Sequence, residues 1–390
     1  MTLAAELERA RVVICAGAGG VGKTTISAAV GLALAAEGRR VAVVTIDPAR
    51  RLAEALGLAE LGNEPQLVAP SLFEGTGLKL RGELHAMMLD AKRTFDDLIE
   101  LLAPSAEAAN AILSNPVYHR LSTAVAGSQE YTAVAKLSEL VRGGRFDTIV
   151  LDTPPSRSAI DFLEAPDRLL SFLEGRAAAG LLSPTGHAAH AAGLVFAALR
   201  RITGVALLDD LTAFFALIAE LLAGFHERAA AVGELLADPS TAFLIVASPE
   251  RAPVEEAIFF AQRLQSSGLQ PRGLILNRVH PARDGSVNLM IATAGRLSPA
   301  LGASLAGRVA RAAADVEQLA QRDRRALRRL RDALNDPALV CLTERAADVH
   351  DIRALVELQR ELFASAPCSS SRASPHGRGK RSPRRVPTPS

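Results

Sequence analysis

The chain has 390 residues, of which 49% are hydrophobic, and its mean hydropathy is +0.18, so it can bury a large core. The net charge is +2, yet the tail at 365–390 holds six basic residues and no acidic one, which leaves a net acidic body. An acidic body argues against a protein that binds nucleic acid or a membrane over its whole surface.

A glycine-rich segment lies between the first predicted strand, at 11–16, and the first predicted helix, at 24–36. It reads GAGGVGKTT and fits G-x-x-x-x-G-K-[ST], in which backbone N–H groups converge on phosphate and the helix N-terminus adds positive potential. In this pattern Lys23 contacts the β- and γ-phosphates, and the Thr24 hydroxyl binds Mg²⁺. The predicted nucleotide site comprises Gly17, Gly19, Gly20, Val21, Gly22, Lys23, Thr24 and Thr25.

Further strands are predicted where short apolar runs separate long helical stretches, at 41–46, 84–89, 148–151, 242–247, 274–279 and 339–342. This alternation predicts an α/β fold, a doubly wound and mostly parallel sheet of the P-loop NTPase type. Three strands end at a polar residue, namely Asp47, Asp152 and Asn277. Ligands of such sheets bind at the carboxyl ends of the strands, so all three side chains are candidates for the site.

Each candidate suits one step of phosphoryl transfer to water. Asp152 would help Thr24 to hold Mg²⁺, directly or through water. Asp47 would position the attacking water with Lys23 as its catalytic partner, because Pro48 stiffens the loop that follows the strand. The alternative for either aspartate is a helix cap or a turn. The amide of Asn277 would read a purine edge, and the absence of a following Lys-x-Asp favours ATP over GTP.

Two intervals without strand signals, about 90–144 and 158–239, predict a helical subdomain inserted into one ATPase domain at 1–364. The apolar segment 211–225 is expected to be core, with an exposed client groove as the alternative. The charge-rich segment 311–336 predicts a solvated helix. The Ser/Pro/Arg-rich tail at 365–390 is expected to be disordered.

Metal sites other than magnesium are not expected. No C-x-x-C pair exists, which argues against structural zinc, and His187 and His190 have no evident third ligand. The acidic residues near the N-terminus do not fit a secretory signal, and the longest uncharged run contains Pro184. We expect a cytoplasmic protein, and leave open a peripheral association with the membrane.

Four segments together resemble the ArsA-like ATPases, a family that includes arsenite-pump ATPases and the targeting ATPase for tail-anchored proteins, and that is related to MinD and ParA. They are the phosphate loop, TIDPARRL (45–52), LDTPPSRSAIDFL (151–163) and LILNRV (274–279). The resemblance covers roughly 10–363 and implies a dimer that hydrolyses Mg-ATP and switches between open and closed forms. It also implies that Asp47 activates water, that Asp152 lies near Mg²⁺ and that Asn277 binds adenine.

The chain departs from the family pattern at Ala18, where a lysine usually reaches the phosphates of the partner subunit. Because arginine fingers contribute ~10³–10⁵ in rate, we expect either slow hydrolysis or a heterodimer whose paralogue supplies the lysine, and both a homodimer and a heterodimer stay open. The family's histidine is replaced by Arg50, and the thiol cluster, zinc motif and methionine-rich groove of its members are absent. The partner implied by the family is a membrane protein or a hydrophobic client, and no specific nucleic acid is expected. A MinD/ParA-like positioning switch and a nucleotide-binding scaffold with negligible hydrolysis stay open as alternatives.

Overall fold

The computed structural model describes residues 2–47, 51–116, 118, 128–154, 205–281, 288–334 and 338–364. Four sequence predictions therefore lie wholly or partly outside the described residues. They concern the loop residues Pro48 and Arg50, the part of the second helical insertion at 158–204, the histidines His187 and His190, and the tail at 365–390. In the part of the chain that the structure describes, no helix combines the length and the apolar character that crossing a membrane requires.

The centre of the fold is an eight-stranded sheet in the order β3-β4-β2-β5-β1-β6-β7-β8. Neighbouring strands pair in parallel except β3 and β4, which are antiparallel. The strands are β1 (Val12–Gly17), β2 (Arg40–Thr45), β3 (Gln66–Leu67), β4 (Glu83–Met88), β5 (Thr148–Asp152), β6 (Thr241–Ala247), β7 (Pro271–Val279) and β8 (Leu339–Thr343). The predicted mostly parallel, doubly wound α/β fold is confirmed.

All seven predicted strands form, with ends shifted by three residues or fewer. The largest shift is at β7, which begins at Pro271, because proline is tolerated as the first residue of a strand. The unpredicted strand is β3, which has two residues, both exposed. A segment that short carries no periodic apolar signal.

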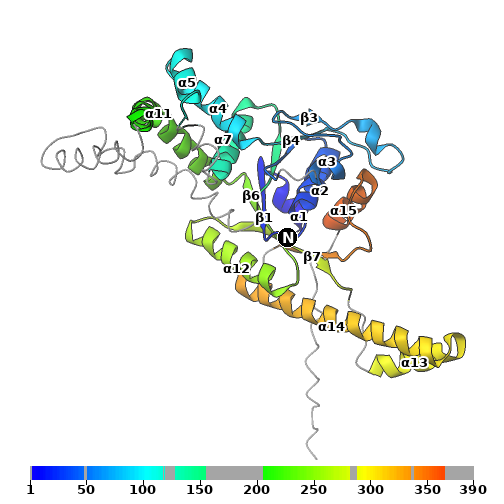
Figure 1. Cartoon of the computed structure of the whole chain (residues 1–390). Helices are drawn as coiled ribbons and strands as arrows, with labels where there is room; N and C mark the ends of the chain where they lie inside the picture. The colour runs from blue at the N-terminus through cyan, green and yellow to red at the C-terminus, as the bar shows by residue number, and fades with distance from the viewer. Residues whose placement is uncertain are drawn as a thin grey trace, which may run out of the picture.

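Helices cover both faces of the sheet (Figure 1). One face is covered by α1 (Leu3–Leu7), α2 (Lys23–Ala36), α3 (Arg51–Ala55) and α15 (Ile352–Ala364). The other is covered by α7 (Ser128–Gly143), the end of α11 (Val205–Ala237), α12 (Arg251–Ser266) and part of α14 (Ala303–Leu334). In β1, Val13 and Cys15 pack on the first face, whereas Val12 and Ile14 pack on the second. Burial on both faces explains why the sequence of this strand is continuously apolar.

The described parts of the two predicted helical insertions form a helical group at one end of the sheet (Figure 1). It consists of α4 (Ala91–Leu102), α5 (Ala106–Leu113), α7 and α11, which pack against one another. The ring of Phe95 in α4 stacks on that of Phe225 in α11 with 6.1 Å between centroids. Leu221 and Phe225, which belong to the segment predicted to be core, are buried.

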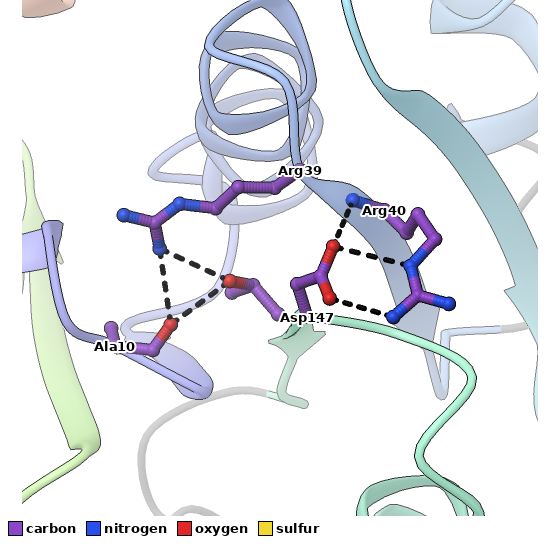
Figure 2. Close-up of polar contacts among 5 residues, drawn as sticks. Ala10, Arg39, Arg40 and Asp147 are labelled. Carbon is purple, nitrogen blue, oxygen red and sulfur yellow. Dashed lines mark hydrogen bonds and ion pairs between the residues drawn. The ribbon is translucent and has the colours of Figure 1, made fainter.

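Polar contacts tie three central strands together at their amino ends (Figure 2). The Arg40 side chain and backbone N–H both donate to Asp147, with 2.7 Å between Nη2 and Oδ1. Arg39 Nη1 donates to the Ala10 carbonyl at 3.3 Å and to Thr148 Oγ1 at 3.2 Å. At the carboxyl ends of the same strands, Cys15 of β1 and Thr45 of β2 both pair with Asp152 of β5.

A helical hairpin follows β7 and extends from the sheet (Figure 1). It is formed by α13 (Asn288–Leu301) and α14, which Gly302 joins with a positive φ of 74°. The prediction of a solvated helix at 311–336 is wrong for one face of α14. Asp323 and Leu330 on that face are buried, because this part of the helix packs against the sheet and α12.

Candidate functional site

The predicted phosphate loop connects β1 to α2. Gly22 is the N-cap of α2 and has φ 94°, a left-handed conformation that glycine adopts without strain. Lys23 is only 8% exposed, and its ammonium donates a hydrogen bond of 2.9 Å to the Ala18 carbonyl of the same loop. Burial lowers the pKa of Lys23, and the charges of Asp152 and Asp47 act in the opposite direction. The loop thus holds a buried ammonium whose partner is its own backbone.

Asp152 ends β5 beside this loop and is 1% exposed. Its Oδ2 accepts hydrogen bonds from Thr24 Oγ1 at 2.7 Å and from Thr45 Oγ1 at 2.9 Å. Its Oδ1 is buried and finds no hydrogen-bond partner among the described residues. Burial raises the pKa of Asp152 to about 6, although the two hydroxyl bonds and the Lys23 ammonium oppose the shift.

The donor set around Asp152 fits a magnesium ion. Mg²⁺ prefers oxygen ligands, and beside nucleotide phosphates it takes only one or two from the protein. Thr24 supplies a hydroxyl, and Asp152 supplies a carboxylate with a free oxygen lone pair at Oδ1. Within the described ranges, no group of three or more His, Cys, Asp or Glu side chains could hold a metal ion by itself.

Thr45 is a site residue that the sequence analysis did not single out. It ends β2, and its hydroxyl donates to Asp152 while accepting the backbone N–H of Asp47 at 3.2 Å. It thereby connects the loop that carries Asp47 to the carboxylate beside the phosphate loop. The signal in the sequence is a polar residue at the end of an apolar strand, two positions before Asp47.

Asn277 lies on the other side of the phosphate loop. Its Nδ2 donates to the Val21 carbonyl at 2.9 Å, and its Oδ1 accepts the Arg278 backbone N–H at 3.0 Å. One N–H and one lone pair remain for a ligand. The amide also lines a cavity of about 70 Å³ together with Gly22, Thr25 and residues of the segment after β8, such as Thr343 and Asp348.

The structure brings together all the sequence-predicted site residues that it describes. Lys23, Thr24, Asp47 and Asp152 lie on one side of the loop, linked by hydrogen bonds or by the interaction of their charges. Asn277 and Thr25 lie on the other side. Between them, Gly19 and Gly20 are exposed.

Comparison with known proteins identifies the family. Residues 10–293 match the family model of the anion-transporting ATPases. Similar proteins include a putative arsenical pump-driving ATPase of Aquifex aeolicus, which is 28% identical over 284 residues (70% of this chain, 64% of that protein). An uncharacterized protein of Streptomyces coelicolor is 30% identical over 275 residues (70% and 63%), and ATPase GET3 of Chaetomium globosum is 25% identical over 285 residues (71% and 75%).

The chain spans slightly less than two thirds of the first two of these relatives. The family match nevertheless covers well over half of the chain, and it includes the phosphate loop, Asp47, Asp152 and Asn277. The resemblance seen in the sequence is thus confirmed, and the chain belongs to the family of anion-transporting ATPases, the ArsA ATPases.

Proposed function

We propose that this chain binds Mg-ATP at the carboxyl end of β1 and hydrolyses it, and that hydrolysis drives a conformational switch. The observation that carries the proposal is the 2.7 Å hydrogen bond between Thr24 and Asp152, beside the buried ammonium of Lys23. A hydroxyl and a carboxylate supply the oxygen ligands that magnesium prefers, and a loop lysine supplies positive charge for the β- and γ-phosphates.

In this proposal each residue has one task. Lys23 exchanges the Ala18 carbonyl for phosphate oxygens, so its buried charge gains an anionic partner. Thr24 and Asp152 hold magnesium directly or through water, and that ion supplies charge neutralisation at the phosphates. Asp47 accepts a hydrogen bond from the attacking water and orients it toward the γ-phosphorus. As the water oxygen bonds to that phosphorus, the bridging bond to the β-phosphate breaks, ADP leaves with the electrons of that bond, and the proton of the water passes to the released phosphate.

Asn277 is the residue we propose for base recognition. Asn277 lines a cavity together with Gly22 and Thr25 and retains one donor and one acceptor, which supports the binding of a nucleobase next to the phosphate loop. The residues that follow, Arg278 and His280, differ from the Lys-x-Asp of GTP sites, so the proposed nucleotide is ATP.

The partners we propose are a second ATPase subunit and a membrane protein or hydrophobic client. The pump-driving ATPases and ATPase GET3 among the relatives support a switch that acts on another protein. Ala18 is 5% exposed and provides no cation for a partner's phosphates. We therefore propose slow hydrolysis in a homodimer, or faster hydrolysis in a heterodimer with a paralogue.

Phosphate release by the purified protein tests the proposal, with Lys23→Ala as the matched control. We expect Mg-dependent release that Lys23→Ala abolishes, and Asp47→Asn should bind ATP but release phosphate far more slowly. Equal rates for the wild type and Lys23→Ala contradict the ATPase. Ala18→Lys should raise turnover if a cation in trans is what the homodimer lacks, and no gain counts against that explanation.

The same preparation separates the partner classes. Antimonite stimulation of phosphate release would support a metalloid pump. ATP-dependent co-sedimentation with lipid vesicles or DNA would support a positioning switch instead. A pull-down with ATP-loaded Asp47→Asn would capture a client that the switch releases on hydrolysis.

A further inference from the structure

The carboxyl end of β7 is irregular at the point where it meets the phosphate loop. Leu276 pairs with Cys341 and Val279 pairs with Thr343, so β7 contains one more residue than β8 between these two pairs. The extra residue is a β-bulge, a feature that turns a side chain away from its regular direction. Here the bulge directs Asn277 onto the Val21 carbonyl of the phosphate loop.

The bulge contains an unfavourable backbone conformation. Arg278 has φ 61°, and it is the single non-glycine residue with positive φ in the described part of the chain. Side chains other than glycine are disfavoured there, and such a conformation persists only when surrounding contacts fix it. One contact is the hydrogen bond from the Arg278 N–H to Asn277.

A second contact fixes the chain two residues later. Both the backbone N–H and the Nδ1 of His280 donate to Asp323 Oδ2, each at 2.8 Å. Asp323 belongs to α14, is 1% exposed, and accepts bonds from Arg322 at its other oxygen. A buried carboxylate is costly unless it is fully paired, and this one is paired with the end of β7.

We propose that Asp323 is a positioning residue for the nucleotide site. By fixing His280, it holds the bulge in its left-handed conformation and keeps Asn277 against the phosphate loop. The inference rests on the proposed function, because it assigns Asn277 to the nucleobase. Its consequence is that nucleotide affinity and base preference depend on a carboxylate in the helical hairpin.

The test uses the full-length protein with Asp323→Leu, which keeps the number and branching of the side-chain heavy atoms and removes both acceptors. Calorimetry should show the Kd for Mg-ATP raised about tenfold, which corresponds to ~1.4 kcal/mol, with a smaller ratio between the affinities for ATP and GTP. Turnover at saturating ATP should stay unchanged, because the carboxylates of the hydrolytic side are not touched. The matched control is Asp332→Leu, an exposed aspartate of the same helix, which should bind ATP like the wild type.

Two further variants separate positioning from a general structural role. Asp323→Asn retains an oxygen acceptor for His280 and should keep most of the affinity. Arg278→Gly, added to Asp323→Leu, should restore the affinity for Mg-ATP, because glycine adopts a positive φ without the support of Asp323. A purely structural effect of Asp323 predicts no such restoration, and that result would overturn the proposal.

Amide hydrogen exchange gives a readout that needs no nucleotide. Exchange at 277–280 should be faster in Asp323→Leu than in the wild type, and unchanged in Asp332→Leu. If Asp323→Leu fails to fold, His280→Ala serves instead, because it removes the side-chain bond to Asp323 and keeps the backbone bond. It should speed exchange at 277–280 and raise the Kd for Mg-ATP, both by less than Asp323→Leu would. Exchange and binding like those of the wild type in this variant would overturn the proposal. A wild-type protein that binds no nucleotide contradicts the proposed function. Unaltered exchange and binding in folded Asp323→Leu contradict only the proposed positioning role of Asp323.

Discussion

Replacing Gly22 by alanine perturbs the site at a point where the structure predicts both the size and the origin of the effect. Gly22 has φ 94°, and an alanine there costs ~1–2 kcal/mol in backbone strain. Its Cβ would lie 2.6 Å from Asn277 Nδ2, so the amide must move and give up its bond to Val21. Losing that bond costs about 1 kcal/mol more, which gives about 2–3 kcal/mol in total.

Urea denaturation of the nucleotide-free protein measures this cost, and two variants divide it. Gly75 has φ 76° and no atom within 4 Å of an added Cβ, so Gly75→Ala should show the backbone strain alone. Adding Asn277→Ala to Gly22→Ala removes the collision, so the two substitutions together should cost ~1 kcal/mol less than the sum of their separate effects.

The affinity for Mg-ATP should fall along with the stability of the loop. If the 2–3 kcal/mol is expressed fully in binding, Kd rises by about 30- to 150-fold. The reasoning is refuted if Gly22→Ala costs the same with and without the Asn277 side chain. That outcome would mean that the amide is not held where the structure places it.

Three further predictions concern single groups. Thr24→Val should weaken the magnesium dependence of ATP affinity and leave magnesium-free binding unchanged, as titrations with and without EDTA would reveal; equal magnesium dependence in both proteins speaks against the assignment. Asp152→Asn should abolish turnover yet stabilise the metal-free protein at pH 7 by up to about 3 kcal/mol, because burial raises the pKa of this carboxyl from 3.8 to about 6; a loss of stability in urea denaturation would contradict this. Burial, aided by the charge of Arg145, lowers the pKa of His85, so the unfolded chain binds a proton at this residue more readily than the folded chain. The free energy of unfolding should therefore fall as the pH drops through 6.5. His85→Gln should make the free energy of unfolding less dependent on pH in this range, and an equal pH dependence in the two proteins would refute the prediction.

The sequence predicted the parts of this fold that depend on local pattern. The buried strands are continuous apolar runs, and the loop between β1 and α2 carries an explicit phosphate-binding pattern. Asp47, Asp152 and Asn277 were identifiable as candidates because each directly follows a mostly apolar run near the carboxyl end of a strand, and parallel strands bring such positions to one edge.

The parts that the sequence could not predict depend on contacts between distant segments. Asp323 stands in a charge-rich helix, and nothing local distinguishes it from its exposed neighbours. Its burial follows from the packing of α14 on the sheet, and its link to His280 spans 43 residues. The bulge at Arg278 is equally invisible, because a register shift is a property of two strands and not of one.

The order of the strands puts the residues proposed for hydrolysis and the residue proposed for base binding on opposite sides of β1. The carboxylates proposed for hydrolysis come from β5 and the end of β2, whereas the amide proposed for the base comes from β7, beyond β6. The residues proposed for hydrolysis and the residue proposed for base binding therefore lie on opposite sides of β1 in the same sheet, and the phosphate loop lies between them. The proposed roles predict that substitutions at the ends of β2 and β5 slow hydrolysis without changing nucleotide preference, and that substitutions at the end of β7 change nucleotide preference without slowing hydrolysis.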